Sequence, residues 1–427
     1  MGECRMSQAA EKRIARALSM AVQQPTLAAG PDEPFEKLHT ILRELFPQVF
    51  SAAQWETVDG RALLGCLRGE GNSQPLLFLS HLDVAPVRNE EKWSVSPFSG
   101  EIRGGYVYGR GALDMKGHLI ALLTAAEGLI EQGFRPLGDI YFAFSCDEEI
   151  RGPSMQKMAR LLEERGVRPA FVLDEGGAVT TLPTLSERPA ALLGIAEKGR
   201  MCFTLTADGE KSMEVLLRAS ERLLKMYFIP RICPVTGQML EALSEDMTGF
   251  DRFCAAHPGK WQGRFLRKLE RTVYGRALSR TQLMISALQG DALRGEKAAI
   301  TFQASILPGD GAQELLKRIQ RVISDDRILV TVDVMDEPSL VSPARGMAWD
   351  ALQTAVHVHF PEAAIVPYLL TGASDARRME SLCPYIYRFS PFIVFPEEMN
   401  RMHGIDERIS IENLIRGTAF FRQMLMA

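Results

Sequence analysis

Acidic residues and histidines follow several short apolar runs of this sequence. Glu148 and Glu149 stand next to each other after one such run, and His81 and Asp83 follow another. In open α/β sheets, ligands bind just beyond the carboxyl ends of the strands, so these side chains are expected to meet at one edge of a sheet. Imidazoles and carboxylates at such an edge can bind divalent cations and transfer protons. A single Glu-Glu pair is more often a solvated turn, and it is the series of such endings that indicates a site.

A hydrolytic site with two metal ions needs five or six ligands from separate segments, and one carboxylate that stays free to handle protons. The sequence offers one candidate ligand in each of five segments: His81, Asp114, Glu149, Asp174 and His403. An aspartate between the first histidine and a later acid can bridge both cations. The excess of negative charge among these residues favours two cations over one.

Glu148 is the predicted general base, which takes a proton from the attacking water. Successive side chains of an extended segment point to opposite faces, so one member of the pair can bind metal while the other catalyses. Asp83 lies two residues after His81, on the same face of an extended segment. It is placed to hold the second imidazole nitrogen of that histidine.

The surrounding elements alternate between predicted strands and helices, which is typical of a mostly parallel sheet with helices on both faces. The helices are expected at 9–22, 33–45, 118–132 and 154–165, and the strands at 62–68, 75–79, 140–144 and 170–173, with a hairpin at 102–108. The pattern of predicted strands and helices changes from about Lys198, and the first pattern resumes near Ser339. We therefore expect an α/β catalytic domain from residues 1–197 and 338–427. A smaller α+β lid domain, residues 198–337, is inserted into it.

Composition excludes some classes of partner. With 53 acidic and 49 basic side chains the net charge is −4, which argues against general binding to nucleic acid or to acidic membranes. The basic stretch 260–280 favours the solvated face of an amphipathic helix over a nucleic-acid site. The seven cysteines are scattered, and no apolar run is long enough to span a membrane. A cytoplasmic location is the resulting expectation.

The series of motifs resembles that of one family of dinuclear zinc hydrolases. This family includes aminoacylase, carboxypeptidase S, acetylornithine deacetylase and succinyl-diaminopimelate desuccinylase, and the carboxypeptidase S branch is the one that the chain resembles most. The resemblance rests on His81-Leu-Asp83, Gly109-Arg-Gly-Ala-Leu-Asp-Met-Lys-Gly117, Asp147-Glu-Glu149, Asp174-Glu-Gly-Gly177, and Met402-His-Gly404 with Glu407.

The resemblance implies a role for each residue. His81 and Asp174 would hold one zinc ion, Glu149 and His403 the other, and Asp114 would bridge them; cobalt or manganese could replace zinc. Glu148 would be the base and Asp83 the acid that orients His81. The expected substrate is a dipeptide or an N-acyl amino acid, cleaved at an amide next to a carboxylate. The lid would provide the contacts of a possible homodimer.

The lid departs from the family pattern. Lys211 stands where the family has a histidine that stabilises the oxyanion, and Gln303 and Ser305 replace an Asn-x-Arg pattern that helps to bind substrate. A further lid asparagine is missing around 290–295. The hypothesis is that Lys211 takes over the electrophilic role, and the alternative is a surface lysine. Arg377 matches a Thr-Asp-x-Arg pattern, which leaves a structural and a substrate-binding role open.

Two functions from different classes remain. The first is a metal-dependent amidohydrolase or exopeptidase, which the complete set of five ligands and Glu148 favours. The second is a metal-binding protein that has kept the fold but lost turnover, with its lid serving as an interaction module. The altered lid is the observation that favours this second function.

Overall fold

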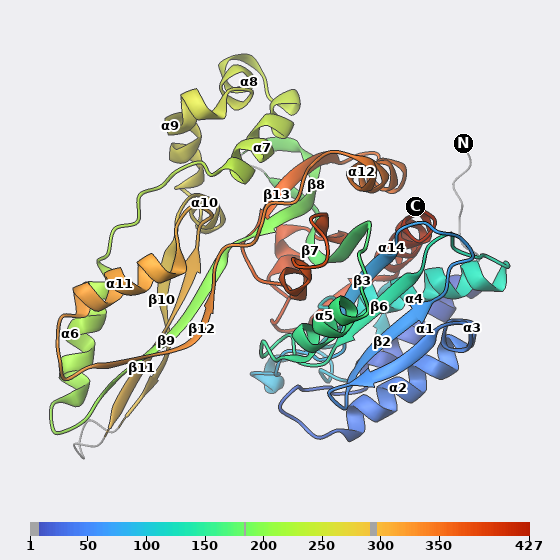
Figure 1. Ribbon diagram of the computed structural model, residues 1–427, viewed down its shortest axis with the longest axis horizontal. Helices are drawn as coiled ribbons and strands as arrows, with labels where there is room; N and C mark the ends of the chain where they lie inside the picture. The colour runs from blue at the N-terminus through green and yellow to red at the C-terminus, as the bar shows by residue number, and fades with distance from the viewer. Residues whose placement is uncertain (1–7, 183–184, 291–296) are drawn as a thin grey trace.

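The computed structural model describes residues 8–182, 185–290 and 297–427, and it contains two large sheets (Figure 1). The larger is an eight-stranded sheet in the order β1-β2-β6-β3-β7-β14-β8-β13. Its strands are β1 (Gln54–Val58), β2 (Ala62–Leu67), β3 (Leu76–His81), β6 (Ile140–Ser145), β7 (Phe171–Leu182), β8 (Ser186–Glu197), β13 (Ala364–Leu370) and β14 (Ile386–Ile393).

The centre of this sheet is parallel and fully buried. Strands β6, β3, β7 and β14 run parallel to their neighbours in that series, whereas β1, β2 and the β7–β8 pair are antiparallel. Every residue of β3 and β6 is buried, as expected for parallel strands covered on both faces. The predicted α/β class with a mostly parallel sheet is confirmed.

Helices cover the sheet in two layers. The chain moves from β3 to β6 in one direction and from β6 to β7 in the other, so right-handed crossovers place the two connecting helices on opposite faces. Helix α5 (Ser154–Glu164) packs on β1, β2 and β6. The layer around the other connecting helix is linked by helix–helix contacts and consists of α1 (Gln8–Val22), α2 (Glu33–Leu45), α3 (Pro47–Ala52), α4 (Lys116–Glu131), α12 (Met347–His359) and α14 (Ile411–Met424).

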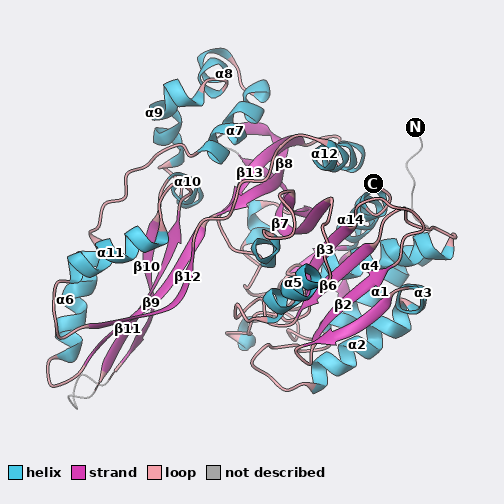
Figure 2. Ribbon diagram, viewed as in Figure 1, coloured by secondary structure: helices cyan, strands magenta, loops and turns pink. Residues whose placement is uncertain are grey.

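A second, four-stranded sheet extends away from the larger one, flanked by two helices (Figure 2). Its order is β10-β11-β9-β12 and all its pairings are antiparallel. Buried and half-buried residues alternate along its two central strands, and the buried face packs against the helices in a separate small core. The elements are β9 (Gly199–Ala207), α6 (Ser212–Leu224), β10 (Gln282–Gln289), β11 (Ala298–Ile306), α11 (Ala312–Ile323) and β12 (Leu329–Asp336).

Not every helix in the range 198–337 belongs to this small core. Helix α7 packs on β13 and β8, and the buried side chains Val235, Leu240 and Phe265 join the core of the larger sheet. These helices therefore extend the catalytic domain in space although they lie within the predicted lid. They are α7 (Pro234–Leu243), α8 (Gly249–Ala255), α9 (Pro258–Leu269) and α10 (Val273–Ser279). Helix α9 buries Phe265 and Leu269 and exposes Arg267, which is the predicted amphipathic pattern.

A small sheet joins two distant parts of the chain. Strand β5 (Tyr106–Tyr108) pairs with β4 (Ile102–Arg103) in the predicted hairpin and with β15 (Arg408–Ser410) on its other side. This pairing brings the loop 402–407 beside the loop 109–115. Short helical segments complete the fold at η1 (Glu90–Lys92), η2 (Ser244–Asp246), η3 (Asp375–Met379) and α13 (Pro396–Met399). In the described ranges, no helix combines the length and the apolar character needed to cross a bilayer.

Candidate metal centre

The candidate ligands gather at the carboxyl ends of the central strands. His81 is the last residue of β3, Glu148 and Glu149 follow β6 by a short turn, and Glu175 lies within β7. The order of connections reverses between β3 and β7, and such a switch point leaves a crevice at the strand ends. The candidate ligands therefore lie at the crevice that the strand order leaves at the carboxyl ends of β3 and β7.

Asp114 stands at the centre of the site and contacts both histidines. Its Oδ1 lies 3.0 Å from Nε2 of His81, and its Oδ2 lies 2.9 Å from Nε2 of His403. Burial raises the pKa of Asp114, but hydrogen bonds from the two imidazoles outweigh that effect and lower it. One carboxylate that offers one oxygen to each histidine has the geometry of a bridge between two cations.

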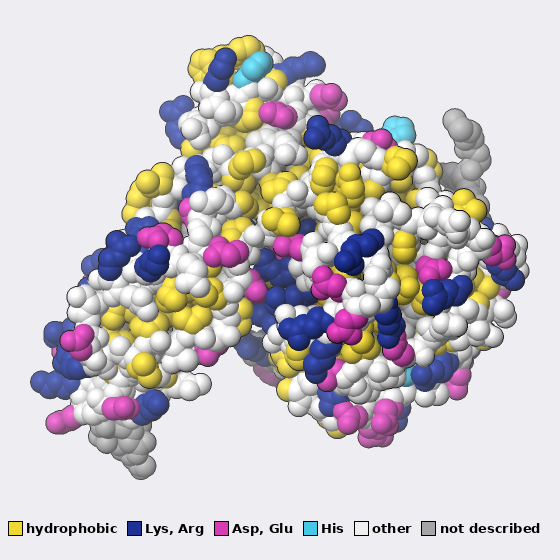
Figure 3. All heavy atoms as spheres, viewed as in Figure 1, with side chains coloured by type: hydrophobic (Ala, Val, Ile, Leu, Met, Phe, Trp, Pro, Cys, Tyr) yellow, Lys and Arg dark blue, Asp and Glu magenta, His cyan; other side chains and the backbone are white. Residues whose placement is uncertain are grey.

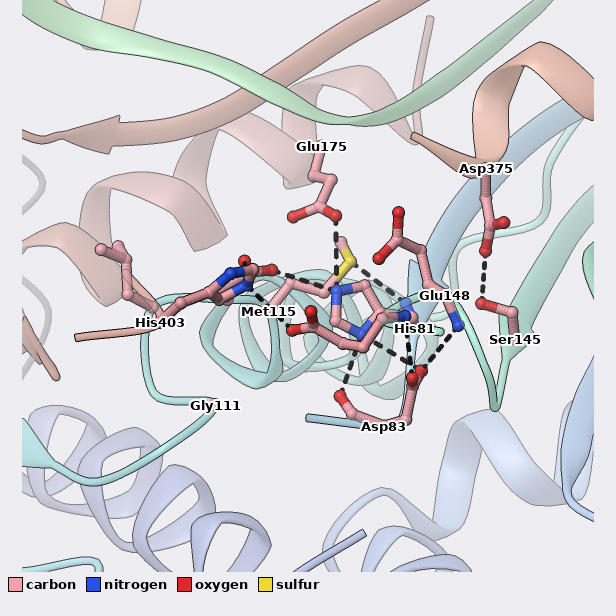
Figure 4. A network of polar contacts seen from close by, with 12 residues as sticks. His81, Asp83, Gly111, Met115, Ser145, Glu148, Glu175, Asp375 and His403 are labelled. Atoms are coloured by element: carbon pink, nitrogen blue, oxygen red, sulfur yellow. Dashed lines mark hydrogen bonds and ion pairs between the residues drawn. The ribbon is translucent and has the colours of Figure 1, made fainter. Parts of the chain in front are cut away.

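Each histidine has one further carboxylate beside it. Glu175 Oε1 lies 3.4 Å from Nε2 of His81, and Glu149 Oε1 lies 3.1 Å from Nε2 of His403. Figure 4 shows Glu175 above His81 and pointing down toward it, with His403 to the left. The five side chains thus form two half-sites that share Asp114. In each half-site, two carboxylate oxygens lie within 3.4 Å of the same imidazole nitrogen.

The structure does not bring Asp174 into this cluster. Its Oδ1 accepts a hydrogen bond from the backbone N–H of Glu175 at 2.8 Å, and its Oδ2 accepts one from the N–H of Ala376 at 2.9 Å. Its neighbour Glu175 faces His81 instead, because adjacent residues of an extended strand point to opposite sides. The position predicted for Asp174 beside His81 is therefore occupied by Glu175.

Asp83 lies behind His81 and is completely buried. Its Oδ1 lies 3.4 Å from Nδ1 of His81, and its own backbone carbonyl is 2.9 Å from the same nitrogen. Its two carboxylate oxygens also accept hydrogen bonds from the backbone N–H groups of Glu148 and Glu149, at 3.1 and 3.0 Å. One aspartate therefore orients the imidazole and fixes the turn that carries both glutamates.

Glu148 points toward His81 from the side opposite to His403 (Figure 4). Its ligand atoms cluster with those of His81 and Glu175. Burial raises its pKa well above the ordinary value, and the nearby charges of Asp375 and Glu175 add to this effect while His81 opposes it. A buried carboxylate with a raised pKa is suited to accept and return a proton.

The donor set fits divalent cations. Burial and the charge of Asp114 raise the pKa of Glu175 to about 8, because several carboxylates share a space with little water. Oxygen Oε1 of Glu149 is buried, and the imidazole of His403 is its one ion-pair partner among the described residues. Imidazole nitrogens with carboxylate oxygens are the ligands that zinc and related metals prefer. Cations at the two half-sites would neutralise this excess negative charge.

Sequence reasoning gave Glu407 no role of its own, but the structure shows that it organises the loop of the bridging aspartate. Its Oε1 accepts hydrogen bonds from the backbone N–H groups of Gly111, Leu113 and Asp114, at 3.0, 2.9 and 3.1 Å. Its Oε2 pairs with Arg110 at 2.6 Å. The only local signal was its position four residues after His403, which by itself predicts no contact with this loop.

The cluster of candidate ligands opens into a cavity of about 670 Å³ that extends to the second sheet. Asp114, Glu148, Glu149, Glu175 and His403 line one end of it. Arg200 and Gln303, both from the second sheet, line another part. Apolar side chains complete the wall: Leu113, Leu370, Phe392, Val394, Met399 and Met402. The cavity is thus lined by the candidate metal ligands, by apolar side chains and by the positively charged Arg200.

Comparison with known proteins decides the family. Residues 77–427 match the family described as peptidase family M20/M25/M40. The chain belongs to this family. It is 31% identical over 441 residues to the N-fatty-acyl-amino acid synthase/hydrolase PM20D1 of Xenopus tropicalis, covering 97% of this chain and 85% of that protein. It is 28% identical over 442 residues to a probable carboxypeptidase S-like 2 of Dictyostelium discoideum, covering 96% and 84%.

Solved structures show the same fold over the whole M20 chain. Human carnosine dipeptidase 1 superposes with a TM-score of 0.75 at 14% identity, covering 98% of this chain and 96% of the other. An M20 family metallo-carboxypeptidase from Sulfolobus solfataricus gives a TM-score of 0.74 at 15% identity, with 99% of both chains covered. The predicted resemblance is confirmed, and this M20 chain is a metallo-hydrolase of the peptidase class.

The other predicted substrate residues of the M20 chain lie in different places. Lys211 is exposed just before α6 and is absent from the described lining of the cavity. Arg377 is 7% exposed and forms an ion pair with the buried Glu197, Nε to Oε1 at 3.1 Å, at the junction of the two sheets. This geometry favours the structural role for Arg377. Of the range 290–295, in which a lid asparagine was predicted to be missing, residues 291–295 lie outside the described residues.

Proposed function

We propose that this chain hydrolyses the amide bond of an N-acyl amino acid whose acyl group is apolar. The observation that carries the proposal is the single cavity in which the Asp114-centred cluster and Glu148 adjoin an apolar wall that includes Phe392 and Met402. An acyl chain on that wall would place its carbonyl carbon at the cluster. The naming of several relatives as N-fatty-acyl-amino acid synthase/hydrolases supports this choice.

A dipeptide is the less favoured substrate. It carries an ammonium group on the acyl side of the scissile bond, and that group needs an acidic partner. Among the described residues that line the cavity, the acids are Asp114, Glu148, Glu149 and Glu175, and all four belong to the cluster. No separate carboxylate is left there to receive the ammonium group.

We propose His81, Glu175 and Asp114 as the ligands of one cation, and His403, Glu149 and Asp114 as those of the other. Zinc is the cation we expect, with cobalt or manganese as alternatives. When bound, such cations polarise the substrate carbonyl and make a water molecule easier to deprotonate. Glu148 takes the proton from that water and returns it to the leaving nitrogen, while Asp83 keeps the imidazole of His81 in position.

The test compares substrates on the purified protein with its metal content measured by mass spectrometry. We expect N-acyl amino acids with long apolar acyl groups to be cleaved with a higher kcat/KM than dipeptides, and Glu148→Gln to abolish both activities. Faster cleavage of dipeptides would overturn the proposed acyl preference. Two bound cations without hydrolysis of either class would instead support the non-catalytic alternative.

Three earlier expectations stay predictions. A homodimer formed through the second sheet can be checked by light scattering, and a cytoplasmic location by fractionation of cells that express the chain. The electrophilic role of Lys211 requires the lid of another copy, because in one chain this exposed residue does not line the cavity. Unchanged turnover in Lys211→Ala would show that the role is wrong.

A further inference from the structure

Two arginines from different parts of the fold reach the same cavity. Arg151 lies in the turn that follows Glu148 and Glu149, and Arg200 is the second residue of β9. Figure 3 shows Lys and Arg side chains gathered in the hollow between the two lobes. Among the arginines that line the cavity, Arg88 is exposed, whereas Arg151 and Arg200 are half-buried.

The side chains of Arg151 and Arg200 form no ion pair within the described part of the chain. No hydrogen bond or ion pair joins either guanidinium to another described residue, although most other half-buried arginines have such partners. Burial and the like charge of Arg151 together lower the pKa of Arg200 to about 10, against the opposing charges of Glu148 and Glu197. Burial raises the pKa of the Cys202 thiol on β9, and the charges of Arg151 and Arg200 oppose this rise.

A guanidinium that is partly removed from water and lacks a partner is unfavourable, and two that repel each other are more so. An anion placed between them would relieve both effects. The acids that line the cavity cannot serve, because all of them lie in the cluster around Asp114. An anion from outside the chain would meet both positive charges.

We infer that Arg151 and Arg200 together bind the carboxylate of the substrate, one arginine from the catalytic domain and one from the second sheet. This inference rests on the proposed function, in which the scissile amide adjoins a carboxylate. Arginine recognises a carboxylate through paired N–H donors, which fixes both its position and its orientation. Since Arg151 lies two residues after Glu149, a carboxylate held there stays close to the cluster. A bound substrate thereby joins the two lobes.

The register of the second sheet offers a matched test. Arg200 on β9 is the direct antiparallel partner of Ser305 on β11, and Gln303 pairs with Cys202. Directly opposite residues carry their side chains on the same face of a sheet. A guanidinium moved from position 200 to position 305 therefore stays on the face that looks toward the cavity.

The experiment compares an N-acyl amino acid with the same compound whose carboxylate is replaced by a carboxamide. In Arg200→Ala and in Arg151→Ala, we expect kcat/KM to fall about 10- to 100-fold for the acid, mainly through KM, which corresponds to the loss of a charge-assisted hydrogen bond. The kcat/KM for the carboxamide should change little, so the ratio of kcat/KM for the acid to that for the carboxamide falls toward one. If the arginines had a purely structural role, their loss would lower kcat/KM equally for both substrates, and this result would overturn the inference.

Two further variants sharpen the result. Arg218→Ala removes an exposed arginine of α6 that pairs with Glu214, and it should leave the ratio of the two substrates unchanged. The double variant Arg200→Ser/Ser305→Arg should recover part of the preference for the acid that Arg200→Ser loses. The double variant could fail to recover the preference for the acid while Arg200→Lys retains it. That result would show that the positive charge is needed at position 200, which also supports the arginine pair.

A binding measurement separates this inference from the proposed function. Calorimetry of the zinc-loaded Glu148→Gln protein with the N-acyl amino acid reports on recognition without turnover. We expect Arg200→Ala in that background to weaken binding about 10- to 100-fold. If the wild-type protein cleaves neither substrate, the proposed function fails, and this titration alone decides the arginine pair. Equal affinity of Glu148→Gln with and without Arg200→Ala, or no binding to either protein, would overturn the inference about the two arginines.

Discussion

The guanidinium of Arg110 and the carboxylate of Glu407 form an ion pair in which both side chains are almost completely buried, with Nη1 and Oε2 separated by 2.6 Å. The residues are 297 positions apart in the chain. Because the other oxygen of Glu407 holds three backbone N–H groups of the loop around Asp114, the pair anchors the central ligand of the cluster. Arg110 also donates to the carbonyl of Gly404, next to His403.

Glu407→Gln should therefore affect both stability and metal binding. The amide would leave Arg110 charged and buried without its counter-ion, which costs about 3–5 kcal/mol when one member of a buried pair is removed. A loosened Asp114 loop should weaken metal affinity by about 10- to 100-fold, as is common for residues that support ligands. Urea unfolding and a competition titration with a chelator measure the two effects. Unchanged affinity would show that the loop keeps its shape without the pair.

Glu148→Gln and Glu149→Gln should have different consequences. We expect the first to lower kcat by about 100-fold or more with metal content unchanged, because general-base catalysis typically contributes that much. The second should lower the metal content, because its Oε1 lies beside His403. Metal analysis and steady-state kinetics on the same preparations separate the two roles. Equal loss of metal in both variants would contradict the assignment of Glu148 as a base.

Glu175→Gln and Asp174→Asn test which of these neighbours is the ligand. Glu175 faces His81, so its variant should lose affinity for one of the two cations. Asp174 accepts backbone hydrogen bonds from Glu175 and Ala376, and an asparagine keeps one oxygen for that purpose. Its variant should lower stability by about 1–3 kcal/mol and leave the metal content unchanged. The reverse pattern of metal loss would restore the original sequence prediction for Asp174.

His118 predicts a specific loss of stability in acid. The ring is fully buried on α4 beside Phe421, neither ring nitrogen has a hydrogen-bond partner among the described residues, and burial lowers its pKa from 6.5 to about 3. Below pH 6.5 the unfolded chain protonates this histidine and the folded chain does not. The stabilisation is thus complete above pH 6.5. It falls by up to about 1.4 kcal/mol per pH unit as the pH drops toward 3.

The control for this prediction is His118→Leu, which has a side chain of similar size that does not titrate. Other acids and histidines are the same in both proteins, so their contributions cancel in the difference between the two unfolding free energies. That difference should change in favour of the variant as the pH falls below 6.5 toward 3, the range set by the two pKa values. Parallel curves for the two proteins would rule out a neutral buried His118.

The sequence by itself determined the α/β class and most of the site. Apolar runs that end in acids or histidines are local signals, and the sheet rule that gathers strand ends needs no knowledge of distant contacts. His81, Asp114, Glu148, Glu149 and His403 could be selected in this way, and so could the position of Asp83 two residues after His81. The second sheet could also be recognised, from its change of pattern near Lys198.

Only the tertiary structure decided the points that depend on distant partners. Glu175 replaces Asp174 beside His81 because the backbone N–H of Ala376, 202 residues further along the chain, takes the aspartate carboxylate. Arg377 lies at the junction of the sheets because Glu197 is buried there and needs a counter-ion. Arg151 and Arg200 line one cavity only because the start of β9, in the second sheet, lies beside the strand ends of the larger sheet. Such pairings leave no pattern in the local sequence, since each is fixed by packing between segments that are far apart in the chain.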